Sequence, residues 1–312
     1  MREVTAMASS PRNHTRRRKI PTRRQYSMRS QISGDVQFNR IWVISGGGSR
    51  GIQAIDLIEK HLAAGFPMPD AILGTSAGGL IAKLISYLGV SEAREEFLRI
   101  KKRRDLFTGN FLWGIGKLGL WNPSRLEKRL EDISKKYSCS LPFYTCSYDI
   151  SAHEIFYFGE NWHNKYHAST ACIPLLVEPI DNIFVDGGLV ENTPLAWAID
   201  SGASEIEVFM CSAPEKKTLR VPETKIEMGL RSLEAMRLHI AEGDEVDVEV
   251  RNEHRIMMDA LRRVAPEELE KLEIYRQYKE VEVRIHVPTE NLLGILEFGK
   301  MREAYEILKR RN

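Results

Sequence analysis

The chain has 312 residues, of which 43% are hydrophobic and 28% charged, and its formal net charge is +2 at pH 7. This length and composition allow a sizeable globular core, and no uninterrupted apolar run of about 18 residues predicts a transmembrane helix. The four cysteines lack C-x-x-C spacing, which argues against a thiolate metal site and a disulfide framework and favours a reducing compartment.

The first thirty residues differ in charge from the rest. They hold nine Lys or Arg residues and one acid, so the remaining chain carries a net charge of −6. Such a segment has too little apolar surface to fold alone, and it lacks the apolar core of a secretory signal. We interpret residues 1–37 as a basic, disordered extension. An organellar transit peptide, an anionic-membrane tether and a nucleic-acid-binding arm are the alternatives.

Strand and helix patterns alternate from residue 40 onward. A buried strand at 41–45 leads through a glycine-rich loop into a helical pattern at 52–62, and a strand at 71–73 precedes a helical pattern at 79–85. This alternation predicts an α/β fold in which a parallel sheet is flanked by helices. The active site is then expected at the carboxyl ends of the strands.

The pentapeptide Gly74-Thr75-Ser76-Ala77-Gly78 lies between the second strand and its helix. A G-x-S-x-G sequence in that context is typical of a nucleophile elbow, where a sharp turn exposes the serine hydroxyl. Gly74 and Gly78 remove side chains that would clash at such a turn. Ser76 is therefore the candidate nucleophile.

The loop Gly46-Gly47-Gly48-Ser49-Arg50-Gly51 has two interpretations. Its glycines fit the G-x-G-x-x-G fingerprint of dinucleotide-binding proteins. That fingerprint needs an acid at the end of the second strand, whereas Asp70 precedes that strand. We favour the second interpretation, in which amides at a helix N-terminus stabilise a developing oxyanion.

Three motifs in order, G-G-G-x-R-G, G-x-S-x-G and the D-G-G of Asp186-Gly187-Gly188, resemble the patatin-like phospholipase family. Two further segments add to the resemblance: A-S-T-A-C-I-P at 168–174, which is one residue longer than the family's A-S-x-A-x-P, and N-x-P at 192–194. It covers roughly residues 40–212. It implies a patatin-like three-layer fold over 38–312, with a motif-bearing core at 40–212 and a helical C-terminal part at 213–312.

The resemblance also implies roles for single residues. Asp186 is the general base acting directly on Ser76, and Gly46, Gly47, Gly48, Arg50 and Gly51 form the oxyanion hole, with Arg50 holding the loop in shape. Taken alone, Asp186 followed by glycine would suggest an ordinary turn, and Arg50 a solvated loop residue. A carboxylate of ordinary pKa is a poor base at neutral pH, so desolvation and neighbouring donors would have to tune it.

Histidines offer an alternative base and a possible metal site, and we favour neither. His239, His254 and His286 follow Asp186, as in a Ser–Asp–His triad, but stand in charged helical or alternating strand patterns. In the strand at 281–287, His286 is expected to point away from the apolar residues. His163 and His167 are four residues apart without a third ligand nearby, which is typical of surface residues. We expect no metal and no cofactor.

Large apolar residues alternate with glycines between 106 and 121. Within this stretch Phe111, Leu112 and Trp113 are the candidate lipid contacts, since tryptophan favours membrane interfaces and glycines suit a mobile flap. Ordinary loop packing is the alternative.

Together these features predict a serine lipid acyl hydrolase of the phospholipase A or lysophospholipase type. An acyltransferase using the same acyl-enzyme and a nucleotide-binding regulatory protein are the alternatives. We expect membrane or micellar lipid as the substrate and peripheral membrane association in a cytoplasmic protein, with organellar targeting also open and no nucleic-acid partner.

Overall fold

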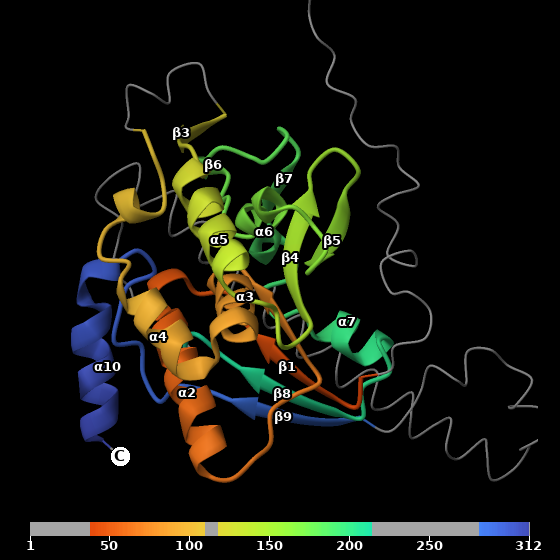
Figure 1. Ribbon diagram of the computed structural model, residues 1–312, viewed down its shortest axis with the longest axis vertical. Helices are drawn as coiled ribbons and strands as arrows, with labels where there is room; N and C mark the ends of the chain where they lie inside the picture. The colour runs from red at the N-terminus through yellow and green to blue at the C-terminus, as the bar shows by residue number, and fades with distance from the viewer. Residues whose placement is uncertain (1–37, 110–117, 214–280, 312) are drawn as a thin grey trace, which may run out of the picture.

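The computed structural model describes residues 38–109, 118–213 and 281–311, and every structural statement below concerns these residues (Figure 1). Several predictions fall elsewhere: the basic extension at 1–37, the lipid contacts Phe111, Leu112 and Trp113, and His239 and His254 all lie outside the described residues.

A seven-stranded sheet forms the centre of the molecule, in the order β5-β4-β2-β1-β8-β9 with β7 also paired to β4. The five strands from β4 to β9 in this order are mutually parallel, while β5 and β7 run antiparallel to β4. The strands are β1 (Arg40–Ile44), β2 (Ala71–Thr75), β4 (Phe143–Asp149), β5 (Glu154–Gly159), β7 (Phe184–Asp186), β8 (Glu205–Phe209) and β9 (Glu282–His286). A separate parallel pair joins β3 (Gly119–Trp121) to β6 (Leu175–Val177).

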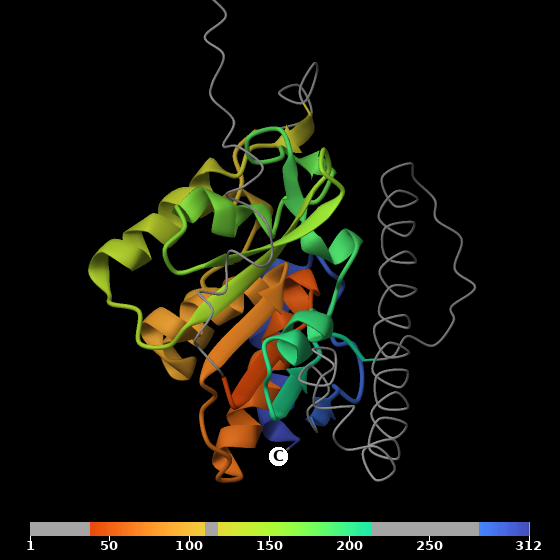
Figure 2. The same cartoon turned by 90° about the vertical axis from the view of Figure 1, so that its right-hand side faces the viewer.

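Helices cover both faces of this sheet, so the predicted α/β fold with a mostly parallel central sheet is confirmed. One face carries α2 (Gly51–Ala63), α3 (Ala77–Leu88) and α4 (Val90–Leu98), and α10 (Met301–Arg310) lies alongside α2 (Figure 1). The other face carries α7 (Leu195–Asp200), on the near side of the strands in Figure 2. The remaining elements are α5 (Ser124–Lys136), α6 (Asn164–Ser169) and the 3₁₀ turns η2 (Gly48–Arg50), η3 (Arg103–Asp105), η4 (Gly187–Leu189) and η6 (Phe298–Lys300).

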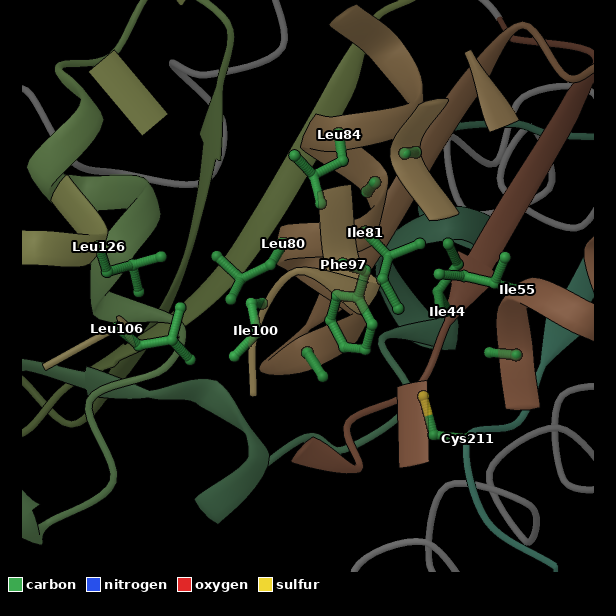
Figure 3. Packing of buried hydrophobic residues seen from close by; sticks show 14 of the residues in the cluster. Ile44, Ile55, Leu80, Ile81, Leu84, Phe97, Ile100, Leu106, Leu126 and Cys211 are labelled. Carbon is green, nitrogen blue, oxygen red and sulfur yellow. The ribbon is translucent and has the colours of Figure 1, made fainter. Parts of the chain in front are cut away.

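The two faces of β1 show why these strands are continuously apolar. Trp42 and Ile44 belong to the cluster under α2 and α3, whereas Ile41 and Val43 belong to the cluster under α7. Successive strand residues point to opposite faces, and both faces are buried here. Figure 3 shows Ile44 with residues of α2, α3 and α4 around it. This packing fixes the carboxyl ends of β1 and β2, where two of the motifs lie.

No helix among the described residues combines the length and the apolarity needed to cross a membrane.

Candidate active site

Ser76 occupies the turn between β2 and α3 in a strained backbone conformation. Its φ of 55° and ψ of −126° lie in a region that residues other than glycine rarely adopt. A Cβ on Gly74 would come within 2.3 Å of the Gly78 carbonyl carbon, and one on Gly78 within 2.2 Å of the Ile44 oxygen. Only glycine fits at these two positions, so the sequence requirement of the elbow has a direct steric cause.

Thr170 ties this turn to strand β4. Its hydroxyl accepts a hydrogen bond of 2.7 Å from the N–H of Ser76 and donates one of 2.6 Å to the Cys146 carbonyl. Thr170 is fully buried. In the sequence it stands at the variable position of the A-S-x-A-x-P segment, so its role was not predicted and no local pattern indicated it.

The pairing of β7 with β4 brings Asp186 to the carboxyl end of β2, where Ser76 lies. Strand β4 pairs with β2 as far as Cys146 opposite Thr75, and its next residue, Ser147, pairs with Asp186 of β7. Strand β5 occupies the other side of β4, so β2 and β7 lie on the same side of β4, one after the other. Because β2 is parallel and β7 antiparallel to β4, their carboxyl ends face each other. Asp186 therefore lies at the level where Ser76 follows Thr75.

Asp186 is buried, with 5% of the residue exposed. One of its oxygens accepts a hydrogen bond of 2.8 Å from the N–H of Gly188, in the turn that begins η4. Its own N–H donates to the Cys172 carbonyl at 3.0 Å. Burial raises the pKa of the Cys172 thiol well above its usual range, and the negative charge of Asp186 raises that pKa further. Cys172 thus stays a neutral thiol and offers no competing nucleophile.

Asn192 lies close to both the serine and the aspartate. A Cβ on Gly46 would stand 3.2 Å from the Ser76 Cβ and 2.6 Å from the Asn192 Oδ1. A Cβ on Gly188 would stand 3.1 Å from an Asp186 oxygen and 3.5 Å from the same Asn192 oxygen. Asn192 is 1% exposed, and neither Oδ1 nor Nδ2 has a hydrogen-bond partner among the described residues. The N-x-P resemblance marked this position without assigning it a role.

The backbone N–H groups of the glycine loop differ in their hydrogen bonding. The N–H of Gly46 donates to the Asn192 carbonyl at 3.0 Å, and the N–H of Ser49 to the Ile295 carbonyl at 2.8 Å. Gly48 has a φ of 57°, and a Cβ there would meet the Ile295 oxygen at 2.2 Å. Among the described residues, no hydrogen bond uses the N–H of Gly47 or Gly48. Both amides lie at the N-terminal end of η2, which continues into α2 at Gly51.

Arg50 is 7% exposed and joins the loop to a distant segment. Its Nε donates to the Leu293 carbonyl at 2.7 Å, and its Nη1 donates to the Ser212 hydroxyl at 3.3 Å. Gln53 adds two bonds to the same segment, donating to the Glu290 carbonyl and accepting from the Leu292 N–H, each at 3.0 Å. The contacts support a loop-holding role for Arg50. The segment 290–295 that it holds was not identified from the sequence.

Asp70 and His286 are each held by groups other than the glycine loop and Asp186. Asp70 accepts hydrogen bonds from the N–H groups of Asn39 and Arg40 at the amino ends of β1 and β2, whereas the glycine loop follows the carboxyl end of β1. His286 is held by Glu207 at 2.6 Å on the edge formed by β8 and β9, rather than by Asp186. These placements count against the nucleotide-binding interpretation and against His286 as a catalytic base.

The surface assignment of His163 and His167 was half wrong. His163 is exposed and accepts a hydrogen bond at the start of α6, but His167 is fully buried and its Nδ1 lies 3.1 Å from the Thr145 hydroxyl. Burial lowers the pKa of His167 well below its usual range, and the charge of Lys83 adds to this shift. A packed, neutral histidine explains the position without a metal.

Comparison with known proteins gives distant relatives and one family. The uncharacterised protein YjjU of Escherichia coli is 28% identical over 184 residues, which cover 54% of this chain and 50% of YjjU. The lysophospholipase NTE1 of Saccharomyces cerevisiae is 26% identical over 189 residues, which cover 52% of this chain and 11% of that protein. The chain thus spans half or less of the length of these relatives.

Among solved structures, VipD from Legionella pneumophila matches with a TM-score of 0.33 at 10% identity, covering 87% of this chain and 67% of the other. The model of the family described as patatin-like phospholipase matches residues 42–199, from β1 to α7. Since this match covers just over half of its residues, the chain belongs to the patatin-like phospholipase family.

Proposed function

We propose that the chain is a serine lipid acyl hydrolase in which Ser76 is the nucleophile and Asp186 the general base. The observation that carries this proposal is the position of Asp186 beside strand β4. Asp186 pairs with Ser147, the residue that follows Cys146, and Cys146 pairs with Thr75, the residue before Ser76. Family membership supports an ester-hydrolysing activity on lipids.

The proposed chemistry uses the groups at the carboxyl ends of β1, β2 and β7. Ser76 Oγ attacks the ester carbonyl while Asp186 takes its proton, and the N–H groups of Gly47 and Gly48 stabilise the charge that develops on the carbonyl oxygen. Asp186 then returns the proton to the leaving alcohol, leaving an acyl-enzyme on Ser76. Water, activated by the same carboxylate, hydrolyses this ester and releases the fatty acid.

The substrate class that we propose is a phospholipid, a lysophospholipid or a neutral glycerolipid. It rests on the family description and on the distant lysophospholipase relative, of which this chain covers 11%. Peripheral association with a membrane or micelle is part of the proposal, because such substrates are presented at a lipid surface.

Labelling with a fluorophosphonate, which reacts with activated serines, tests the assignment of the nucleophile. We expect the label on the peptide that contains Ser76, and none after Ser76→Ala. Ser151→Ala is the matched control, since Ser151 lies in the turn between β4 and β5, bonded to Asp149. A label found on another serine, or kept after Ser76→Ala, would contradict the proposal. Product analysis with alcohol added then separates hydrolysis from acyl transfer.

A further inference from the structure

Three side chains that can bind metals converge at a sheet edge that the proposed reaction does not use. His61 lies in the last turn of α2, Glu207 in β8 and His286 at the end of β9, and one ligand atom from each lies within 4.8 Å of the others. The glycine loop meets α2 at its opposite end, near Gly51. The cluster is therefore separate from the candidate active site.

His61 points to a missing ligand. It is 4% exposed, and neither its Nδ1 nor its Nε2 has a hydrogen-bond partner among the described residues. A neutral imidazole carries one N–H and one lone pair, so both are buried unsatisfied here. The ring is held by Phe66, stacked at 4.4 Å, and by Trp42, edge-on at 5.8 Å. An ion bound to this ring would use its lone pair.

Glu207 and His286 complete the cluster. Glu207 is 1% exposed, and its Oε2 lies 2.6 Å from the Nε2 of His286, while its other oxygen is held by Arg284. Arg284 also pairs with Glu282 at 2.7 Å, which offsets its charge beside Glu207. The imidazole of His286 is stacked on Phe209 at 4.8 Å. Aromatic packing thus orients both imidazoles, and Arg284 orients the carboxylate.

We propose that His61, Glu207 and His286 form a binding site for a divalent transition-metal ion, best represented by Zn²⁺. Two imidazoles and one carboxylate suit zinc, whereas Ca²⁺ and Mg²⁺ prefer oxygen ligands. Tetrahedral zinc with bonds of about 2.0–2.2 Å places its ligand atoms about 3.3–3.6 Å apart. The ligand atoms, which lie within 4.8 Å of one another, would have to approach by up to about an ångström, and the pair Glu207–His286 would have to open by a similar amount. The His286 side chain is 27% exposed, which lets water take the fourth position.

The site would fasten the last turn of α2 to β8 and to the edge strand β9. Its three residues are far apart in the sequence, which is why the spacing of histidines along the chain predicted no metal. Because the cluster lies apart from Ser76 and Asp186, the inference does not depend on the proposed hydrolysis.

Metal analysis of the full chain tests this inference. The protein, free of any histidine tag, is stripped with a chelator, dialysed against ZnCl₂ and analysed for bound zinc, and we expect one ion per chain. His61→Phe keeps an aromatic ring between Phe66 and Trp42 without a ligand atom. Since losing even an outer-shell partner costs about 10–100-fold in affinity, this variant should bind more than about 100-fold more weakly. His286→Gln should show the same loss.

Two control variants should bind zinc like the parent chain. His153→Asn removes an exposed histidine outside the cluster, and Cys139→Ser removes the one cysteine among the four that is not buried. Zinc should also raise the melting temperature of the parent and both controls, but not of His61→Phe. Absence of zinc binding by the parent would overturn the inference, as would zinc binding by a folded His61→Phe or His286→Gln at the parent's affinity.

Discussion

The backbone N–H of Ser76 donates a hydrogen bond of 2.7 Å to the hydroxyl of Thr170. This bond matters because Ser76 holds a strained backbone conformation, and a strained residue persists only when its surroundings fix it. The same hydroxyl is bonded to the Cys146 carbonyl of β4. Thr170 thereby connects the nucleophile turn to the strand that also pairs with Asp186.

Thr170→Val should lower both stability and turnover. Valine keeps the shape of the side chain but leaves the Ser76 N–H and the Cys146 carbonyl without their partner, which costs roughly 1–3 kcal/mol for a buried group. We expect a lower melting temperature. We also expect kcat to fall by a larger factor than the factor by which KM changes. Thr170→Ser keeps the hydroxyl and should restore most of the activity. Parental activity in Thr170→Val together with a loss in Thr170→Ser would show that the methyl group, rather than the hydrogen bonds, is what the site needs.

Asn192→Leu should separate stability from activity. The Asn192 amide is buried without a partner among the described residues, and a similar-sized apolar side chain removes that cost. If the amide contacts the substrate or the transition state, turnover should fall by about 10²-fold, as for other polar groups around an oxyanion, while the melting temperature holds or rises. Urea unfolding and steady-state kinetics on one preparation measure both. A destabilised variant with normal kcat would assign Asn192 a purely structural role.

Lys83 predicts how stability depends on pH. Burial lowers its pKa to about 8, with its ammonium lying over the rings of Tyr87 and Phe143. The unfolded chain keeps the ordinary, higher lysine pKa, so it binds more protons than the native state between that value and pH 8. The free energy of unfolding should therefore increase with pH from about 8 to the ordinary lysine pKa. Below pH 8 the buried charge of Lys83 destabilises the native state most.

Lys83→Met is the variant that isolates this contribution. At about 1.4 kcal/mol per pKa unit, it should stabilise the protein near pH 7 by up to a few kcal/mol, and the gain should shrink toward pH 10. Lys60→Met, which removes a partly exposed lysine paired with Asp56, is the comparison. A gain independent of pH would mean that the side chain stabilises by packing rather than by losing its charge.

The local features of the fold were predictable, because each depends on neighbouring residues. The strand before the glycine loop and the helix after Ser76 follow from apolar spacing and from glycines that have steric reasons in the structure. The approach of β7 toward the end of β2 was not predictable from the residues themselves. Strand β7 has three residues, Phe184–Asp186, which are too few to show an alternating apolar pattern. Only the family resemblance linked Asp186 to Ser76.

Residues whose role depends on distant partners escaped sequence analysis. His286 lies on the same face of β9 as Glu282 and Arg284, as alternation predicts, but its ring is also stacked on Phe209, because alternation within a strand does not tell what neighbouring elements place on that face. His167 was assigned to the surface and is buried for the same reason. The bracing of Arg50 by the Leu293 carbonyl joins parts of the chain that share no pattern.

The turnover number of Asp186→Asn tests the central claim most directly. Asparagine keeps the size of the side chain and its ability to accept the Gly188 hydrogen bond but cannot take a proton from Ser76. Since catalytic residues that act as a unit lose most of their advantage when one is removed, kcat for a lipid ester should fall by roughly 10³-fold or more, as for Ser76→Ala, with the melting temperature preserved. A folded Asp186→Asn variant that hydrolyses the ester at a rate near that of the parent would contradict the assignment of Asp186 as the base.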